Sequence, residues 1–319
     1  MQPNKKNALR LIGNVIMLIS VGFIVKTLLS FDVDFKSLWQ PQMLLTIFGL
    51  IFAYALTLFS AAAAWRDILK FLSGREIVYG EAFAIYTKAN LGKYLPGNVL
   101  HYANRQVFGA QLGLSQIRLL LATMLEIVYS LGTAFVFGLT FAGDVIAEIY
   151  HSYLPHFNPW LAAISLCVIA FAALTGLYIA LRKKAWFNEL LALAKTRAFL
   201  LLSLKLIALY SANLLVFGLM QAILINFYTP LSIENAILVF LATTVSWLVG
   251  TVTPGAPGGI GVREWVFSLM LQGMAPMDII LLAAVIQRII GVISELVCFA
   301  AGVVWTKKRH EGRAAHAGE

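Results

Sequence analysis

Two arginines follow two Pro-Gly pairs at the same distance, and this spacing is the first sign of chemistry in the sequence. Arg105 lies nine residues after Pro96, and Arg263 lies nine residues after Pro254. Pro-Gly pairs end helices. The helix that restarts after a break presents free N–H groups with partial positive charge, which bind anions. Guanidinium groups bind phosphate or carboxylate in a bidentate manner. The pattern predicts an anion-binding site at two broken helices.

Further residues near the breaks extend this prediction. An asparagine after the first break is expected to cap the restarting helix. Glycines after the second break would let a ligand approach the backbone closely. An arginine inside the last long apolar stretch is costly unless it is paired or hydrated. The predicted substrate-binding residues are Lys93, Asn98, Arg105, Gly258, Gly259, Arg263 and Arg288.

Three carboxylates in the same segments leave a second interpretation open. They are Glu126, Glu264 and Glu295. These groups could carry coupling protons, or they could neutralise the arginines and simply hold the helices together, because ions inside membranes usually pair. Arg288 and Glu295 are seven residues apart, so they share a helix face without being near neighbours. Each is expected to need another partner.

The composition identifies the class of protein that must position these charges. The 319 residues are 60% hydrophobic and only 12% charged, with a mean hydropathy of +0.83. A soluble domain carries about 25% charged residues. We therefore expect an all-α membrane protein, formed by residues 1–319 as a single polytopic domain. The net charge of +9 is attributed to cationic cytoplasmic loops and not to nucleic-acid binding. No phosphate-binding loop, metal-binding motif or cofactor motif is present, so no cofactor or metal is expected.

Six apolar stretches have the length of about 20 residues that a spanning helix needs. They are Leu9–Phe31, Met43–Trp65, Leu119–Gly143, Pro159–Leu181, Phe199–Ile225 and Ile279–Trp305. Clusters of Lys and Arg near residues 5–10, 66–75, 182–197 and 307–313 alternate with loops that are mainly acidic. The positive-inside rule then predicts a multi-pass protein of a bacterial-type inner membrane, with both termini and the tail 306–319 in the cytoplasm.

Two remaining segments, about 81–114 and 236–273, contain the Pro-Gly breaks. The predicted orientation places both flanks of each segment on one side of the membrane. We therefore interpret them as two re-entrant broken-helix hairpins, one from each face, in an inverted repeat that surrounds a shared polar cavity. The alternative for the first segment is a helix pair lying flat at the interface, because it carries many charges.

The motifs at the two breaks resemble a known family. The stretch Asn90–Asn98 with Arg105, together with Thr253–Gly255 and Gly258–Glu264, is similar to the transmembrane region of lysylphosphatidylglycerol synthases, also called flippase-like membrane proteins. The resemblance covers nearly the whole chain. It implies a helical bundle that moves lipids or lipid-linked intermediates between leaflets. The aminoacyl-transfer domain of the full synthases has no counterpart here, so synthesis of lysyl-lipid is not expected.

These features together favour a flippase or transporter over an enzyme. The expected partners are the membrane and an anionic phospholipid or a polyprenyl-phosphate-linked lipid, with envelope-biosynthesis enzymes as candidate protein partners. The chain departs from the family pattern at one position. Many family members carry an arginine directly after the glutamate that corresponds to Glu126, whereas this chain has Ile127 there. One alternative is an integral glycosyltransferase that uses a lipid-linked sugar, with Asp32 and Asp34 holding a metal ion and, through it, the phosphate. Another is a non-catalytic scaffold for envelope assembly.

Overall fold

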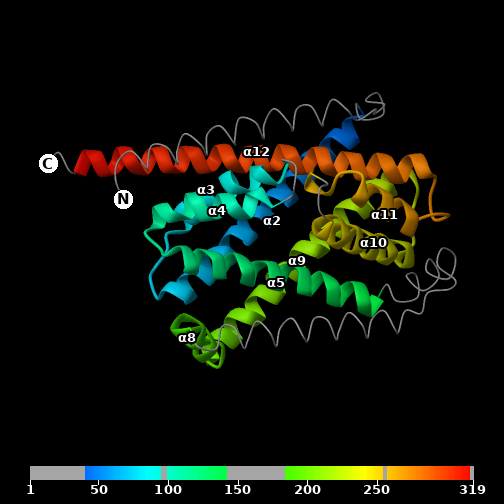
Figure 1. Ribbon diagram of the computed structural model, residues 1–319. Coiled ribbons are helices and arrows are strands. Elements are labelled where there is room, and N and C mark those ends of the chain that lie inside the picture. Colours follow the sequence, from blue (N-terminus) through cyan, green and yellow to red (C-terminus); the bar gives the residue numbers. More distant parts are fainter. Residues whose placement is uncertain (1–39, 95–98, 142–183, 254–256, 317–319) are drawn as a thin grey trace. The chain divides into compact units, whose positions relative to one another are not determined.

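A computed structural model describes residues 40–94, 99–141, 184–253 and 257–316, and these residues form helices joined by short turns and loops, without strands (Figure 1). By internal packing the chain divides into two compact units. One comprises residues 1–142 and 206–319, and the other comprises residues 143–205. The second unit contains helix α8 (Ala185–Ala194) and the first turns of α9 (Arg197–Tyr228). Everything discussed below, apart from those turns, lies in the first unit.

Five helices are long and apolar enough to cross a membrane, so the protein is an all-helical, multi-pass membrane protein. They are α2 (Pro41–Ser73), α5 (Gln116–Phe141), α9, α10 (Ile233–Val252) and α12 (Met277–His316). Four of them coincide with spans predicted from the sequence. The other two predicted spans, 9–31 and 159–181, lie outside the described residues.

The fifth long helix, α10, belongs to the segment predicted as the second re-entrant hairpin. Its 20 residues extend about 30 Å, which equals the thickness of the hydrocarbon core. Ser232 caps its start by accepting a hydrogen bond of 3.2 Å from the N–H of Asn235. The first arm of this segment is therefore longer than a re-entrant arm requires.

Each of the two unusual segments is a helix, a tight turn and a second, short helix. In the first, α3 (Tyr79–Asn90) runs into the 3-10 turn Leu91–Tyr94, and α4 (Leu100–Gly109) follows. In the second, α10 is followed by the 3-10 turn Pro257–Gly259 and α11 (Val262–Met270). A glycine with positive φ then precedes each long helix, Gly113 before α5 and Gly273 before α12.

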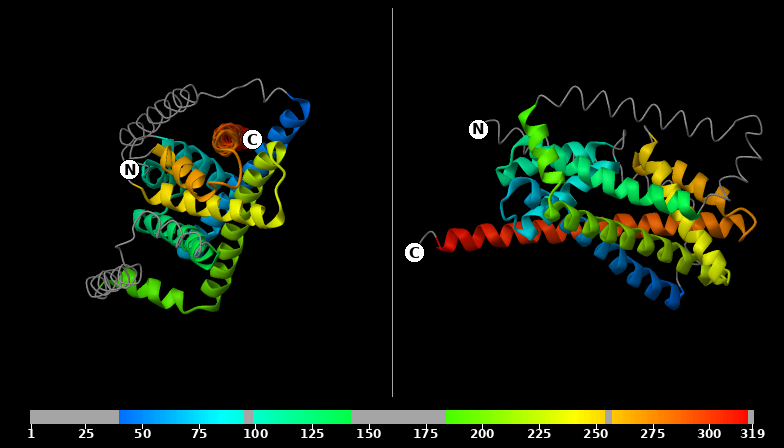
Figure 2. Two further views of the ribbon diagram at one scale, coloured as in Figure 1. Left: turned by 90° about the vertical axis from the view of Figure 1, so that its right-hand side faces the viewer. Right: turned by 90° about the horizontal axis from the view of Figure 1, so that it is seen from below.

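The two halves, α2 to α5 and α9 to α12, exchange packing partners. Helix α3 packs against α12 of the second half, and α10 packs against α5 of the first half. At the first contact, a Cβ added at Gly302 of α12 would lie 3.0 Å from the Cα of Ala84 in α3. Glycine thus allows the two helix backbones to approach closely, as is typical of helix contacts in membranes. The left view of Figure 2 looks down α12.

Long helices of the two halves run in opposite directions. In Figure 1, α5 begins at the end where α12 finishes, and α3 and α4 lie toward that end. Helices α10 and α11 lie toward the opposite end, where α12 begins. The two broken segments therefore occupy opposite ends of the unit that contains α2 to α5 and α10 to α12.

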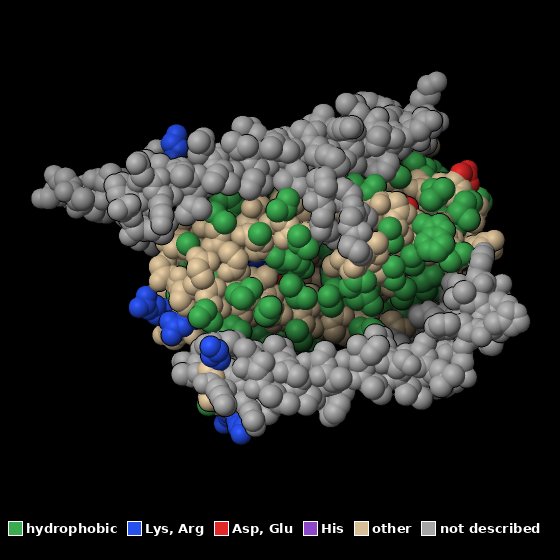
Figure 3. All heavy atoms as spheres, in the orientation of Figure 1, with side chains coloured by type: hydrophobic (Ala, Val, Ile, Leu, Met, Phe, Trp, Pro, Cys, Tyr) green, Lys and Arg blue, Asp and Glu red, His purple; other side chains and the backbone are tan. Residues whose placement is uncertain are grey.

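The outer surface of the long helices is apolar. Leu45, Phe48 and Phe52 form a stripe on α2, and each is more than 60% exposed. In the space-filling view of the same orientation, hydrophobic side chains are spread over the described surface between the two ends (Figure 3). Such a surface is stable against lipid and unfavourable in water, because each exposed apolar side chain would cost about 1.5–3 kcal/mol.

Candidate functional site

A cavity of about 240 Å³ lies between the two broken segments, among helices that are otherwise apolar. Both 3-10 turns contribute to its wall: a Cβ at Gly258 would lie 3.8 Å from the ring of Tyr94 and 3.9 Å from the carbonyl oxygen of Lys93. The structure therefore brings the two 3-10 turns into contact around one polar space. About 10–15 Å³ suffices for one water molecule, so this cavity is large enough for many water molecules or for a small polar group with some of them.

The first charged pair joins α4 to α5. The Nη1 of Arg105 forms an ion pair with Oε2 of Glu126, and the hydroxyl of Tyr86 donates to Oε1 of the same carboxylate at 2.9 Å. The guanidinium also lies over the ring of Tyr86, 4.1 Å from its centroid. Arg105 is only 2% exposed. Both carboxylate oxygens are engaged, so this pair fixes the short helix to the long helix that follows it.

The second pair joins α11 to α12 with the charges reversed. The Nε of Arg288 donates to Oε1 of Glu264 at 2.7 Å, and its Nη1 donates to the carbonyl oxygen of Gly258 at 2.7 Å. The N–H of Gly261 donates to Oε2 of Glu264 at 2.7 Å, which satisfies a free donor at the start of α11. Both carboxylate oxygens of Glu264 therefore have a partner in its own half.

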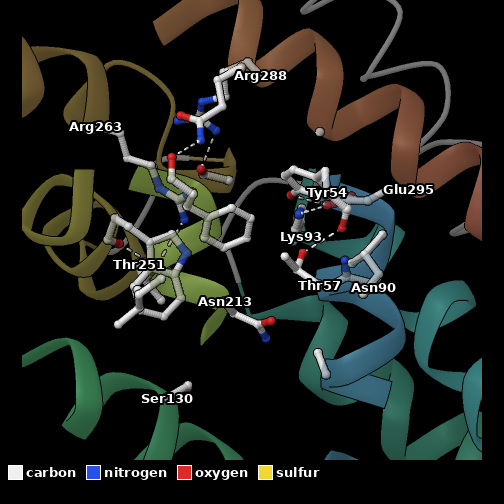
Figure 4. Close-up of a pocket in the computed structure, with 18 of the residues that line it drawn as sticks. Tyr54, Thr57, Asn90, Lys93, Ser130, Asn213, Thr251, Arg263, Arg288 and Glu295 are labelled. Atoms are coloured by element: carbon white, nitrogen blue, oxygen red, sulfur yellow. Dashed lines mark hydrogen bonds and ion pairs between the residues drawn. The ribbon is translucent and has the colours of Figure 1, made fainter. Parts of the chain in front are cut away.

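The third pair connects the two halves. Lys93, in the first 3-10 turn, forms an ion pair with Oε1 of Glu295 in α12, and the hydroxyl of Tyr54 in α2 donates to the same oxygen at 3.0 Å. Figure 4 shows Tyr54, Lys93 and Glu295 gathered on one side of the cavity. Arg288 and Glu295 thus each have a partner on another element, as their spacing in the sequence predicted.

Arg263 differs from the other cations because it forms no ion pair with a carboxylate of the described residues. Its Nη2 donates to the hydroxyl oxygen of Thr251 at 3.1 Å, and both residues lie on the wall opposite Lys93 in Figure 4. A Cβ at Gly250 would lie 2.2 Å from the Cγ of Arg263. The glycine thus makes room for the arginine stem against α10, and Gly250 and Thr251 together position the guanidinium.

The cavity carries an excess of positive charge. Four cationic side chains line it against three carboxylates, which gives a formal charge of +1 with His101 neutral. Three guanidinium nitrogens are also buried without a hydrogen-bond partner in the part of the chain that the structure describes. They are Nε of Arg105, Nε of Arg263 and Nη2 of Arg288. Buried N–H donors of a charged group are costly unless an acceptor meets them, so a hydrogen-bond acceptor that reached these nitrogens would be bound favourably.

The structure divides the predicted binding residues into three groups. Lys93, Arg105, Arg263 and Arg288 all line the cavity, and so does Gly258. Gly259 instead packs on α10, because a Cβ there would lie 2.7 Å from the carbonyl oxygen of Gly250. The missing side chain at Gly259 therefore allows close packing on α10 and does not make room for a ligand. Asn98, and the pair Asp32 and Asp34 of the glycosyltransferase alternative, lie outside the described residues.

Several lining residues were not predicted from the sequence, and the clearest group is on α9. Tyr210, Asn213, Phe217 and Gln221 all line the cavity. Their separations of three or four residues put them on one helix face. This stripe could have been recognised in the sequence, because it places polar residues on a helix that was predicted to span the membrane. Polar residues inside a membrane usually face the interior of the helix bundle.

Comparisons of the chain with protein-family models, curated proteins and solved structures find no match.

Proposed function

We propose that this protein is a flippase or transporter that moves an anionic lipid, a phospholipid or a polyprenyl-phosphate-linked species, across a bacterial-type inner membrane. The headgroup binds in the cavity between the two broken segments, and the acyl or prenyl chains remain in the bilayer. The observation that carries the proposal is the uncompensated Arg263, accompanied by buried guanidinium donors without partners. A cation held at membrane depth without a counter-ion is expected to mark a substrate or ion pathway.

The interpretation as structural ion pairs accounts for only part of the site. It explains Arg105 and Arg288, whose carboxylate partners lie in their own halves. It leaves Arg263 unexplained, because the oxygens of Glu264 are engaged by Arg288 and by the N–H of Gly261. A phosphate oxygen at this point would accept from the arginine and complete the charge balance.

An inverted-repeat arrangement with two re-entrant segments is part of the same proposal. The exchanged packing of α3 on α12 and α10 on α5, and the opposite directions of α5 and α12, support it. Transporters of this architecture bind their substrates where broken helices of two halves meet near the bilayer centre. Rocking of one half against the other would expose the cavity to each side in turn.

A scramblase-type assay in proteoliposomes tests the function. Fluorescent acyl-labelled phosphatidylglycerol and a fluorescent polyprenyl phosphate are placed in both leaflets, and a membrane-impermeant quencher measures how quickly the inner pool appears outside. Wild-type protein should raise this rate above protein-free vesicles for at least one probe. Arg263→Gln should lower it about tenfold or more, because it removes the uncompensated charge.

Arg75→Gln is the matched control. Arg75 is exposed in the turn after α2, outside the cavity lining, so its loss should leave the rate unchanged. If wild-type protein moves neither probe faster than empty vesicles, or if Arg263→Gln transports as well as wild type, the proposed function is wrong.

A further inference from the structure

The cavity contains unpartnered groups, and a phosphate cannot satisfy all of them. Besides the arginine donors, Oε1 of Gln221, the hydroxyl of Tyr210 and Oε2 of Glu295 are buried without a hydrogen-bond partner among the described residues. A phosphodiester offers acceptors only. The oxygens of Gln221 and Glu295 accept hydrogen bonds, so a ligand that completes this site must also bring donors.

The two groups on Gln221 and Tyr210 lie among neutral polar and aromatic side chains of α9 and α10, whereas Glu295 belongs to α12. Gln221 and Tyr210 are 4% and 6% exposed, and both belong to the α9 stripe, while Leu215 and Leu219 on the outer face of the same helix are largely exposed. On α10, the buried Thr243 and Ser246 line the same cavity, and their hydroxyls already donate to backbone carbonyl oxygens, so towards a ligand they offer acceptors. A neutral amide or hydroxyl here is stable only with a partner, because an unsatisfied one costs about 1–3 kcal/mol.

Hydroxyl groups meet this requirement better than an ammonium group. A hydroxyl both donates and accepts, so it can satisfy the amide of Gln221 in either orientation and the phenol of Tyr210 as well. An ammonium would add a cation to a cavity that already has an excess of positive charge, and it would lose more hydration on entering. The faces of Phe217, Trp247 and Phe267 complete the lining with apolar surface that can cover a ring.

From this lining we infer that the headgroup is a phosphate ester of a polyhydroxyl ring, such as a sugar or a cyclitol. This inference rests on the proposed function and specifies its substrate class. The phosphate binds Arg263 and the free Nη2 of Arg288, and the hydroxyls bind the polar stripe of α9. A glycerophospholipid and a polyprenyl phosphate can each carry such a ring without any change in this chemistry.

Ligand-induced thermal stabilisation of the purified full-length protein in detergent tests the inference. Two pairs of phosphodiester probes carry the same single negative charge and differ in the ring: phosphatidylinositol with phosphatidylmethanol, and polyprenyl-phosphate-hexose with the methyl ester of polyprenyl phosphate. Phosphatidylethanolamine is the ammonium probe. A lipid that binds the folded state raises its melting temperature by mass action, so titration gives an apparent Kd. In at least one pair the apparent Kd of the ring-bearing lipid should be lower than that of its partner by about tenfold or more. That pair shows whether a glycerophospholipid or a polyprenyl phosphate carries the ring.

Variants on α9 separate the ring site from the phosphate site. Gln221→Leu should weaken binding of the ring-bearing lipid about tenfold, the equivalent of about 1.4 kcal/mol, and leave the ring-free lipid unchanged. Tyr210→Phe removes one hydroxyl with little change of shape and should have the same selective effect, which guards against misfolding of the leucine variant. Arg263→Gln should weaken both members of a pair equally.

Two results would overturn the inference while leaving the proposed function in place. One is equal binding of ring-bearing and ring-free lipids with no selective effect of Gln221→Leu or Tyr210→Phe. The other is that phosphatidylethanolamine binds more tightly than every other lipid tested, and that Arg263→Gln weakens its binding. By contrast, stabilisation by no anionic lipid at all would refute the proposed function itself.

Discussion

Two buried arginines of the same cavity should respond in opposite ways when their charge is removed. Arg105 forms an ion pair with Glu126 and is 2% exposed, so Arg105→Gln leaves a carboxylate buried without a counter-ion. Breaking a buried pair from one side costs about 3–5 kcal/mol. Since about 1.4 kcal/mol corresponds to a factor of ten, the folding equilibrium should fall by roughly two to nearly four orders of magnitude.

Arg263 should behave differently because no described carboxylate depends on it. Arg263→Gln removes a charge that is held against Thr251, and the Thr251 hydroxyl keeps a partner because it also donates to the carbonyl oxygen of Trp247 at 2.7 Å. In a buffer without phosphate or anionic lipid we expect the free energy of unfolding to change by less than about 1 kcal/mol, since an unpaired buried charge is itself unfavourable.

The measurement is equilibrium unfolding in mixed detergent micelles for wild type, the two single variants and the double variant Arg105→Gln/Glu126→Gln. The double variant removes both charges and should recover most of the lost stability, which attributes the loss to the pair and not to packing. Equal destabilisation by Arg105→Gln and Arg263→Gln would refute the reasoning, because it would mean that Arg263 also holds a structural partner.

Two further predictions concern orientation and the positioning of Arg263. Cysteines placed at Val99 and Ile260, in a background free of native cysteines, should react with an impermeant maleimide from opposite sides of the membrane; reaction of both from one side would contradict the inverted arrangement. Gly250→Ala should lower the affinity for the anionic lipid that binds wild type about tenfold, because its Cβ would lie 2.2 Å from the Cγ of Arg263, and unchanged affinity in the titration above would show that Gly250 does not position the arginine.

The long helices could be predicted from the sequence because their signal is local. Each apolar stretch carries its own hydropathy and length, and the structure places α2, α5, α9 and α12 where these patterns predicted. The break predicted at Pro96-Gly97 also came from local composition, but these two residues lie outside the described part of the chain, which reaches the 3-10 turn Leu91–Tyr94 just before them. Helix α10 was not among the predicted spans because topology counting required the segment 236–273 to return to its starting side, and that argument says nothing about how far a helix extends.

The partners of the charged residues could not be predicted, because they depend on tertiary packing. Arg263 and Glu264 are neighbours in sequence, yet one faces Thr251 and the other binds Arg288. The role of Gly250 was also hidden, since only the packed structure shows that Arg263 occupies the space its side chain would fill.

The pairing of Lys93 with Glu295 has a consequence for how the chain is made. The two residues are 202 positions apart, and the helix that supplies Glu295 is the last long element of the sequence. At about 5–20 residues per second, a ribosome needs roughly 10–40 s to proceed from one residue to the other. During that interval the ammonium of Lys93 lacks its carboxylate, and a long side chain in that position can keep its charge at the water interface. The first broken segment is therefore expected to enter its final position only after α12 has been synthesised. Insertion of the half that contains α2 to α5 would then be completed by the half that contains α9 to α12.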